Sequence, residues 1–189
     1  MATHIFTVPN QITFLRLATL PFFLIFIYYG RFQWALAILL AAAFTDLLDG
    51  ILARRLNQKS ALGAYLDPIA DKLLLSSSFL MLAVKGELFW WLTILVLSRD
   101  VLILAISAAI LVTVGYRPLP PSIYGKITTG VQILLVFVVI ATEAVSLPWL
   151  DRIEAPLTYL VAAFTIFSGV HYSFVIARRL QAGEPPSAD

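Results

Sequence analysis

Long apolar segments make up most of this 189-residue chain and limit what it can fold into. Hydrophobic residues account for 60% of it and charged residues for 13%, against roughly half and a quarter in soluble domains. A helix needs roughly 20 mainly apolar residues to cross a bilayer, and about six segments approach that length. None of them alternates polar and apolar residues as the strands of a membrane barrel do. The expected fold is therefore all-α, a polytopic membrane protein with about six transmembrane helices.

The expected spans belong to a single domain, residues 1–180, followed by a polar tail, residues 181–189, that we expect to be disordered. Pro9 and Asn10 precede the first span and predict a short N-terminal interfacial helix, because proline suits the first turn of a helix. The chain has no cysteine, which excludes disulfides and thiol chemistry. The expected spans run from about Ile12 to Tyr29, Phe32 to Leu56, Asp67 to Val84, Leu88 to Val114, Ile127 to Ala144 and Leu157 to Ile176.

Positive side chains gather on one expected side of the membrane. Multi-pass proteins keep an excess of Lys and Arg on the cytoplasmic side, and an even number of spans leaves both termini together. Arg31, Lys85 and Arg152 fall on the opposite side, and Arg99 lies within a span. We therefore expect cytoplasmic (or matrix-side) termini, with the ends of the second and third spans beside them. The positive residues on this side are Arg16, Arg54, Arg55, Lys59, Lys72, Arg117, Lys126, Arg178 and Arg179.

One polar stretch carries four aspartates in an otherwise apolar chain. Asp46 and Asp49 are three residues apart and Asp67 and Asp71 are four apart, so each pair shares a helix face. If the chain reverses near Asn57, Asp46 comes level with Asp71, and Asp49 with Asp67. Four carboxylates at one depth would repel one another, and a divalent cation relieves that repulsion. Carboxylate oxygens are ligands that Mg²⁺ and Mn²⁺ prefer.

Two other interpretations of these aspartates compete with a metal site. They could form structural salt bridges with neighbouring Arg and Lys side chains, or line the ion path of a cation transporter. Gly50 and Gly63 favour a binding site over both alternatives, because glycine lets a ligand or a neighbouring helix approach the backbone closely. Arg54 adds a planar cation suited to phosphate. Together these residues favour a site for a metal and a phosphorylated ligand.

The full spacing is D-x2-D-G-x2-A-R-x8-G-x3-D-x3-D, beginning at Asp46 and ending at Asp71. It resembles the signature of the CDP-alcohol phosphatidyltransferase family. The segment VPNQITFLRLATLP also resembles the opening segment of that family, and the resemblance covers about Val8 to Arg179. The family's six-helix membrane core agrees with the number of spans counted above.

The resemblance implies a role for each motif residue. Asp46, Asp49 and Asp67 are implied to bind Mg²⁺ or Mn²⁺. Asp71 is implied to lie at the same metal site and to act as the base that deprotonates the acceptor hydroxyl. The residues implied to hold the CDP part of the donor are Gly50, Ala53, Arg54 and Gly63.

The family's reaction sets the expected partners. An alcohol attacks the β-phosphoryl group of CDP-diacylglycerol, and CMP is released. The partners are then CDP-diacylglycerol, a glycerol-type acceptor and membrane lipid, with no nucleic acid. The family also implies a homodimer. The site is expected at the cytoplasmic side of a membrane, the inner membrane if the chain is bacterial.

Residues in a different part of the chain indicate which acceptor alcohol is used. Lys126 in YGKITTGVQ resembles the GK-x-x-T-x-x-Q segment of phosphatidylglycerophosphate synthases, and Arg99 in SRD stands where those synthases carry an Arg-Glu pair. Both are implied to bind an acceptor phosphate. Alternatively, Arg99 pairs locally with Asp100, and Lys126 is a cytoplasmic anchor at a helix start.

One position departs from the glycerol-phosphate pattern. Ser107 occupies the place of a second arginine, so a dianionic phosphate would lack one cation. The segment NQKSALGAYLDPIADK is in addition similar to the cardiolipin synthases of the same family. We expect glycerol-3-phosphate as the acceptor, with phosphatidylglycerol, a phosphodiester of lower charge, as the alternative. Inositol phosphate and serine are more distant alternatives.

Overall fold

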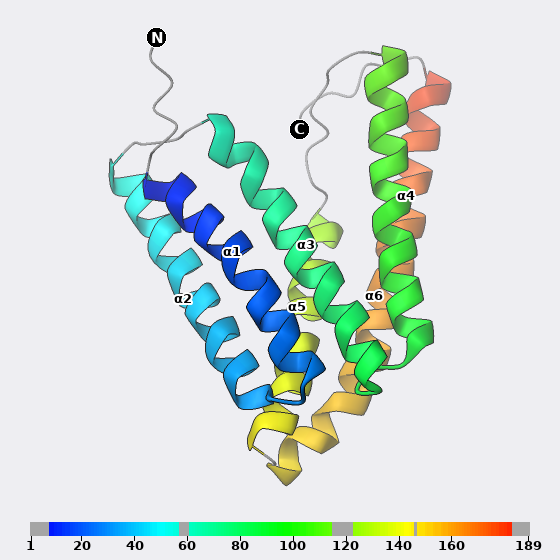
Figure 1. The fold of residues 1–189 in the computed structure, drawn as a ribbon. Coiled ribbons are helices and arrows are strands. Elements are labelled where there is room, and N and C mark those ends of the chain that lie inside the picture. Colours follow the sequence, from blue (N-terminus) through cyan, green and yellow to red (C-terminus); the bar gives the residue numbers. More distant parts are fainter. Residues whose placement is uncertain (1–7, 57–60, 115–122, 146, 183–189) are drawn as a thin grey trace. The chain divides into compact units, whose positions relative to one another are not determined.

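The computed structural model describes residues 8–56, 61–114, 123–145 and 147–182. In these ranges the chain forms six helices and no strand, which confirms the expected all-helical class (Figure 1). The helices are α1 (Val8–Tyr28), α2 (Phe32–Leu56), α3 (Ala61–Lys85), α4 (Trp90–Val114), α5 (Ile123–Val145) and α6 (Pro148–Ala182).

The helix boundaries agree with the sequence at α2 and differ elsewhere. Pro9 and Asn10 form the first turn of α1, so the expectation of a separate interfacial helix at these residues is wrong. Proline fits there because the first turn makes no use of its missing N–H. Helix α3 begins six residues before the expected span and α6 nine residues before it, because hydropathy marks apolar segments and not helix ends. Residues 183–189 of the expected tail lie outside the described residues.

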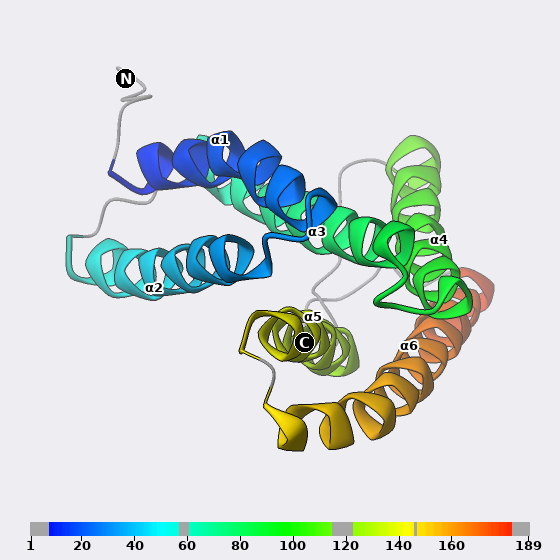
Figure 2. The ribbon, with the colours of Figure 1, turned by 60° about the horizontal axis from the view of Figure 1, so that its bottom comes forward.

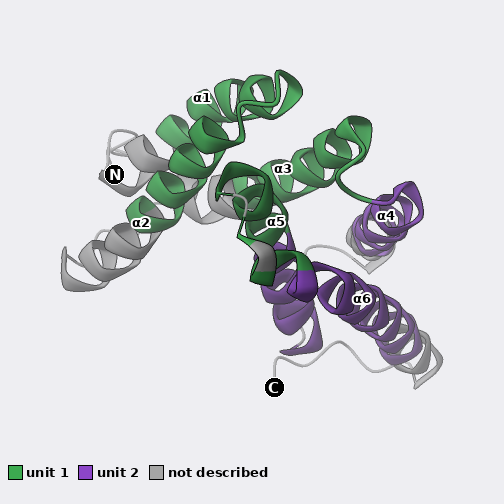
Figure 3. Cartoon of the chain, turned by 90° about the horizontal axis from the view of Figure 1, so that it is seen from below, with its two compact units in different colours: residues 1–88, 136–151 green, residues 89–135, 152–189 purple. Residues whose placement is uncertain are grey.

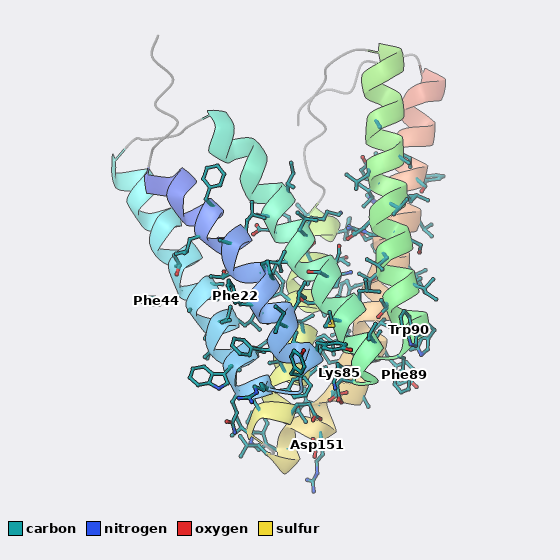
Figure 4. The ribbon with its side chains drawn as sticks, viewed as in Figure 1. Phe22, Phe44, Lys85, Phe89, Trp90 and Asp151 are labelled. Carbon is teal, nitrogen blue, oxygen red and sulfur yellow. The ribbon has the colours of Figure 1, made fainter. Side chains whose placement is uncertain are left out.

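Two helices of the described chain are long and apolar enough to cross a membrane, Ile123–Val145 and Trp149–Val175, while α1 and α2 carry shorter apolar stretches. Large apolar side chains also lie on the surface. Phe22 of α1 is 60% exposed and Phe44 of α2 is 63% exposed (Figure 4). Exposed apolar faces of this kind are typical of membrane or partner contacts. These features indicate membrane association, and two of the six expected spans meet the length criterion.

The chain divides into two compact units (Figure 3). Unit 1 comprises residues 1–88 and 136–151, which include α1, α2, α3 and the second half of α5. Unit 2 comprises residues 89–135 and 152–189, which include α4, the first half of α5 and most of α6. The aspartate motif belongs to unit 1.

Helix α1 organises unit 1, because it packs against both α2 and α3 (Figure 2). Phe23 and Ile27 of α1 are fully buried, as are Phe79 and Leu82 of α3. Close van der Waals packing of this kind holds helices together even in lipid, where the hydrophobic effect between helices is absent. The two helices that carry the aspartates therefore share α1 as a neighbour.

Glycines end α1 and α3 and let the chain turn. Gly30 has a φ of 67° and Gly86 a φ of 85°, values that glycine adopts without the steric cost that other residues meet. After Gly30, the Arg31 N–H donates to the Phe26 carbonyl at 2.8 Å. After Gly86, the Glu87 N–H donates to the Leu82 carbonyl at 2.9 Å. These are Schellman motifs, which satisfy the last carbonyls of a helix.

Within unit 2, α6 contacts both α4 and α5 through polar and aromatic groups. Trp91 of α4 stacks on Tyr159, with 6.3 Å between ring centroids. Buried Gln132 of α5 donates from Nε2 to Thr165 Oγ1 at 3.1 Å. Buried polar side chains need such partners, and hydrogen bonds between helices help to hold membrane bundles together.

Lys85 ends α3 (Figure 4). Glu87, two residues later, has a raised pKa. Burial is the main cause of the raised pKa, and the negative charge of Glu143 adds to it, while Lys85 acts in the opposite direction. The folded state therefore holds the Glu87 proton more tightly than the unfolded state does. Stability falls as the pH rises from the ordinary value of 4.5 through the raised pKa, and the loss is complete above it.

Replacing Glu87 by Gln removes the loss of stability that accompanies ionisation of Glu87. We expect the Glu87→Gln variant to unfold at a higher temperature than the wild type at neutral pH. The difference should shrink towards zero below the ordinary pKa of the group, where both proteins are uncharged at this position. Thermal unfolding in detergent at several pH values measures it. A variant that is less stable than the wild type at neutral pH would contradict the sign.

Candidate active site

The aspartate motif is divided between two helices of unit 1. Its first half lies in α2 and its second half in α3. The two helices run in opposite directions, and the end of α2 and the start of α3 lie at the same end of unit 1 as the start of α1 (Figure 1). The structure describes the backbone of all motif positions and, among their side chains, that of Asp71. The α2 positions are Asp46, Asp49, Gly50, Ala53 and Arg54, and the α3 positions are Gly63, Asp67 and Asp71.

Asp71 contacts an arginine of α1. The Arg16 guanidinium donates from Nη1 to Oδ1 of Asp71, across the α1–α3 packing. The Arg16 side chain is only 9% exposed, whereas the Asp71 side chain is 60% exposed. A nearly buried cation thus supports a carboxylate that is accessible from outside.

A cavity of about 110 Å³ lies between α1 and α2 beside this ion pair. Arg16 contributes to its wall, and so does Thr45, the residue before Asp46. Arg16 therefore pairs with Asp71 on α3 and lines a cavity together with Thr45 of α2, the residue before the motif. The cavity is lined by Leu15, Arg16, Thr19, Ile38, Ala41, Ala42 and Thr45.

Arg16 is the residue of this site that the sequence analysis missed, since it was counted there as a charge that orients the chain. The structure instead places it inside α1 and in contact with Asp71. Its signal in the sequence is a lone arginine within the apolar run FLRLATLP. A charged side chain within an apolar membrane helix is costly and usually has a partner.

The chemistry of the motif fits a hard divalent cation. The motif carries aspartates on two helices of one unit, and carboxylate oxygens are the ligands that Mg²⁺ and Mn²⁺ prefer. Among the described side chains there is no group of three or more His, Cys, Asp or Glu placed to hold a metal, and of the four aspartates this set includes Asp71 alone. Asp71 fits the role of a ligand, since its side chain is accessible.

Arg99 belongs to unit 2 and is held on two sides. Its Nη1 donates to Asp100 Oδ1 at 3.0 Å and its Nη2 to Ser168 Oγ of α6 at 2.9 Å. The local pair with Asp100 that the sequence offered as an alternative is therefore present. Both side chains are nearly buried, at 10% and 9% exposure. Arg99 Nε is buried without a hydrogen-bond partner among the described residues, so the guanidinium keeps one donor unused there.

The other two acceptor positions also lie in unit 2. Lys126 is exposed in the first turn of α5. Its neighbour Tyr124 packs against the rings of Phe167 and His171 of α6, with centroid distances of 5.1 and 4.7 Å. Ser107 lies in α4, and its side chain is outside the described residues.

Comparison with known proteins identifies the family. The family model described as CDP-alcohol phosphatidyltransferase matches residues 6–170, and the chain belongs to this family. It is thus a phosphatidyltransferase, an enzyme class of phospholipid synthesis.

Relatives within the family carry two different names. A probable phosphatidylglycerophosphate synthase of Mycobacterium tuberculosis is 33% identical over 187 residues, which cover 94% of this chain and 84% of the relative. A cardiolipin synthase (CMP-forming) of Streptomyces coelicolor is 39% identical over 132 residues, which cover 67% of this chain and 61% of the relative. A human cardiolipin synthase (CMP-forming) is 32% identical over 190 residues, with 88% and 61% covered.

The Arg99–Ser168 contact makes a prediction about stability. Ser168 is buried, so Ser168→Ala leaves an Nη2 donor of Arg99 short of an acceptor. We expect a loss of about 1–3 kcal/mol, seen as a lower unfolding temperature in detergent. Ser173→Ala is the matched control, because its hydroxyl bonds the Gly169 carbonyl of its own helix, and its loss should be smaller. Equal losses in the two variants would contradict the prediction.

Proposed function

We propose that this enzyme transfers the phosphatidyl group of CDP-diacylglycerol to glycerol-3-phosphate and releases CMP. The observation that carries the proposal is the aspartate motif on two antiparallel helices of unit 1, with an accessible Asp71 supported by Arg16. Membership of the CDP-alcohol phosphatidyltransferase family supports the donor and the type of reaction.

The proposed chemistry assigns a task to each motif residue. The acceptor hydroxyl oxygen attacks the β-phosphorus of the donor, its proton passes to Asp71, and the bond to the CMP phosphate breaks. Gly50, Ala53 and Gly63 leave room for the nucleotide, and Arg54 binds a phosphate. The aspartates would hold a Mg²⁺ or Mn²⁺ ion, which would supply positive charge to neutralise the pyrophosphate. The four ligands proposed for it are Asp46, Asp49, Asp67 and Asp71.

The proposed setting is a multi-pass membrane protein with the motif at the cytoplasmic side. Exposed apolar side chains on α1 and α2 support contact with lipid, from which CDP-diacylglycerol arrives. Nine positive residues fall on the proposed cytoplasmic side and three on the other. A homodimer is proposed from the family alone.

Glycerol-3-phosphate is the proposed acceptor because the Mycobacterium tuberculosis relative matches nearly the whole chain and bears the corresponding name. We propose that Arg99 and Lys126 bind its phosphate. Phosphatidylglycerol is the second candidate, and two observations favour it. Asp100 already pairs with Arg99 and offsets its charge, and Ser107 supplies no further cation. A phosphodiester needs less positive charge than a dianionic phosphate.

The acceptor is tested directly with purified protein, CDP-diacylglycerol and Mg²⁺. Glycerol-3-phosphate and phosphatidylglycerol are supplied in separate reactions, and the lipid product is identified by mass spectrometry. We expect phosphatidylglycerophosphate and CMP from the first reaction. Cardiolipin from the second reaction with no product from the first would overturn the proposed acceptor. Cation uptake into liposomes without any CMP release would favour a transporter.

Asp71→Asn tests the proposed base. The amide keeps the shape of the side chain and cannot take the proton, so turnover should fall by about 10²–10⁴-fold while the protein stays folded. Asp151→Asn is the control, because Asp151 is an exposed aspartate of the same unit at the start of α6 (Figure 4). Its turnover should match the wild type. Full turnover in Asp71→Asn would remove Asp71 from the mechanism.

A further inference from the structure

Arg16 occupies an unusual position for a charged residue. It lies near the start of the apolar stretch of α1, Phe14–Tyr28, and its side chain is only 9% exposed. An arginine keeps its charge at any pH that proteins tolerate, so it cannot enter such a place as a neutral group. It needs a partner, and the structure provides Oδ1 of Asp71.

We propose that Arg16 is a positioning residue of the active site, which fixes the Asp71 carboxylate in the orientation needed for metal and acceptor. This inference rests on the proposed function, because it takes Asp71 as ligand and base. Arg16 lies outside the aspartate motif in sequence, 55 residues before Asp71. It acts through Asp71 and takes no part in the transfer of the proton.

The contact restricts the side chain that carries the chemistry. An exposed aspartate on a helix exchanges between rotamers unless something holds it. A guanidinium is a planar donor with a fixed geometry, so the contact restricts the orientation of the carboxylate that it holds. When the carboxylate is already held in place before the metal binds, less conformational entropy is lost on binding.

The cavity between α1 and α2 extends the argument to the other half of the motif. Arg16 and Thr45 line it together, and Thr45 directly precedes Asp46. Helix α1 thus presents the same side chain to both helices that carry aspartates. A change at Arg16 is expected to disturb the relative placement of the two halves, and so the metal site as a whole.

The test compares Mn²⁺ binding and turnover in Arg16→Met with those of the wild type. Methionine fills a similar volume without charge or donors. Loss of a residue that orients a metal ligand typically costs about 10–100-fold in metal affinity or activity, and we expect a loss in that range for both. Binding is followed in the full-length protein by the electron paramagnetic resonance signal of free Mn²⁺, with CDP present. Arg16→Lys, which keeps the charge and loses the planar fork, should lie between the two.

Two controls separate positioning from a purely structural role. Arg31→Met removes an exposed arginine of the same unit and should leave Mn²⁺ affinity and turnover unchanged. In the Asp71→Asn background, adding Arg16→Met should change Mn²⁺ affinity much less than it does in the wild type, because the partner is already altered. If Arg16→Met does not give monodisperse protein, Arg16→Gln, which keeps one donor, takes its place.

The outcomes distinguish this inference from the function on which it rests. Wild-type Mn²⁺ affinity and turnover in folded Arg16→Met would overturn the role of Arg16. An equal loss of affinity with and without Asp71→Asn would also overturn it, since Arg16 would then act independently of Asp71. A wild-type protein that releases no CMP with either acceptor would instead contradict the proposed function, and the Mn²⁺ comparison would still decide whether Arg16 shapes the site.

Discussion

The ion pair between Arg16 and Asp71 is the interaction on which the account of this site depends. Carboxylates beside apolar helices are costly unless cations or hydrogen bonds compensate them. Arg16 supplies one such cation from α1, the helix that packs on both α2 and α3. The pair therefore links the packing of unit 1 to its chemistry. Helix α1 packs on both helices that carry the aspartates, and the proposed metal and phosphate site rests on that arrangement.

The sequence predicted the helical class and the location of the motif, because both follow from local patterns. The bounds of α2 agree with the prediction since a glycine turn precedes that helix and a polar break follows it. The start of α3 was placed too late, because the prediction began the span at Asp67, whereas ALGAYL before it already forms helix. The pairing of Arg16 with Asp71 could not be predicted, since periodicity reports which residues share a face and not which faces of separate helices meet.

Unit 2 shows the same limit at Arg99. The sequence offered two roles, an acceptor site and a local pair with Asp100. The pair is present, and Ser168, 69 residues away, completes it. Ser168 carries no signal of its own in the sequence, because serines that bond their own helix have the same spacing and surroundings. Asp100 offsets the charge of Arg99. The charge of the acceptor is therefore what distinguishes the two candidates, glycerol-3-phosphate and phosphatidylglycerol.

The most direct test of the central claim is a crystal structure of the protein with CDP and Mn²⁺, with the metal located by its anomalous scattering. The account predicts a manganese peak between α2 and α3, coordinated by carboxylates of the motif that include Asp71, with Arg16 still bonded to the Asp71 side chain. A manganese peak away from these aspartates, or a nucleotide bound with no metal beside them, would contradict it.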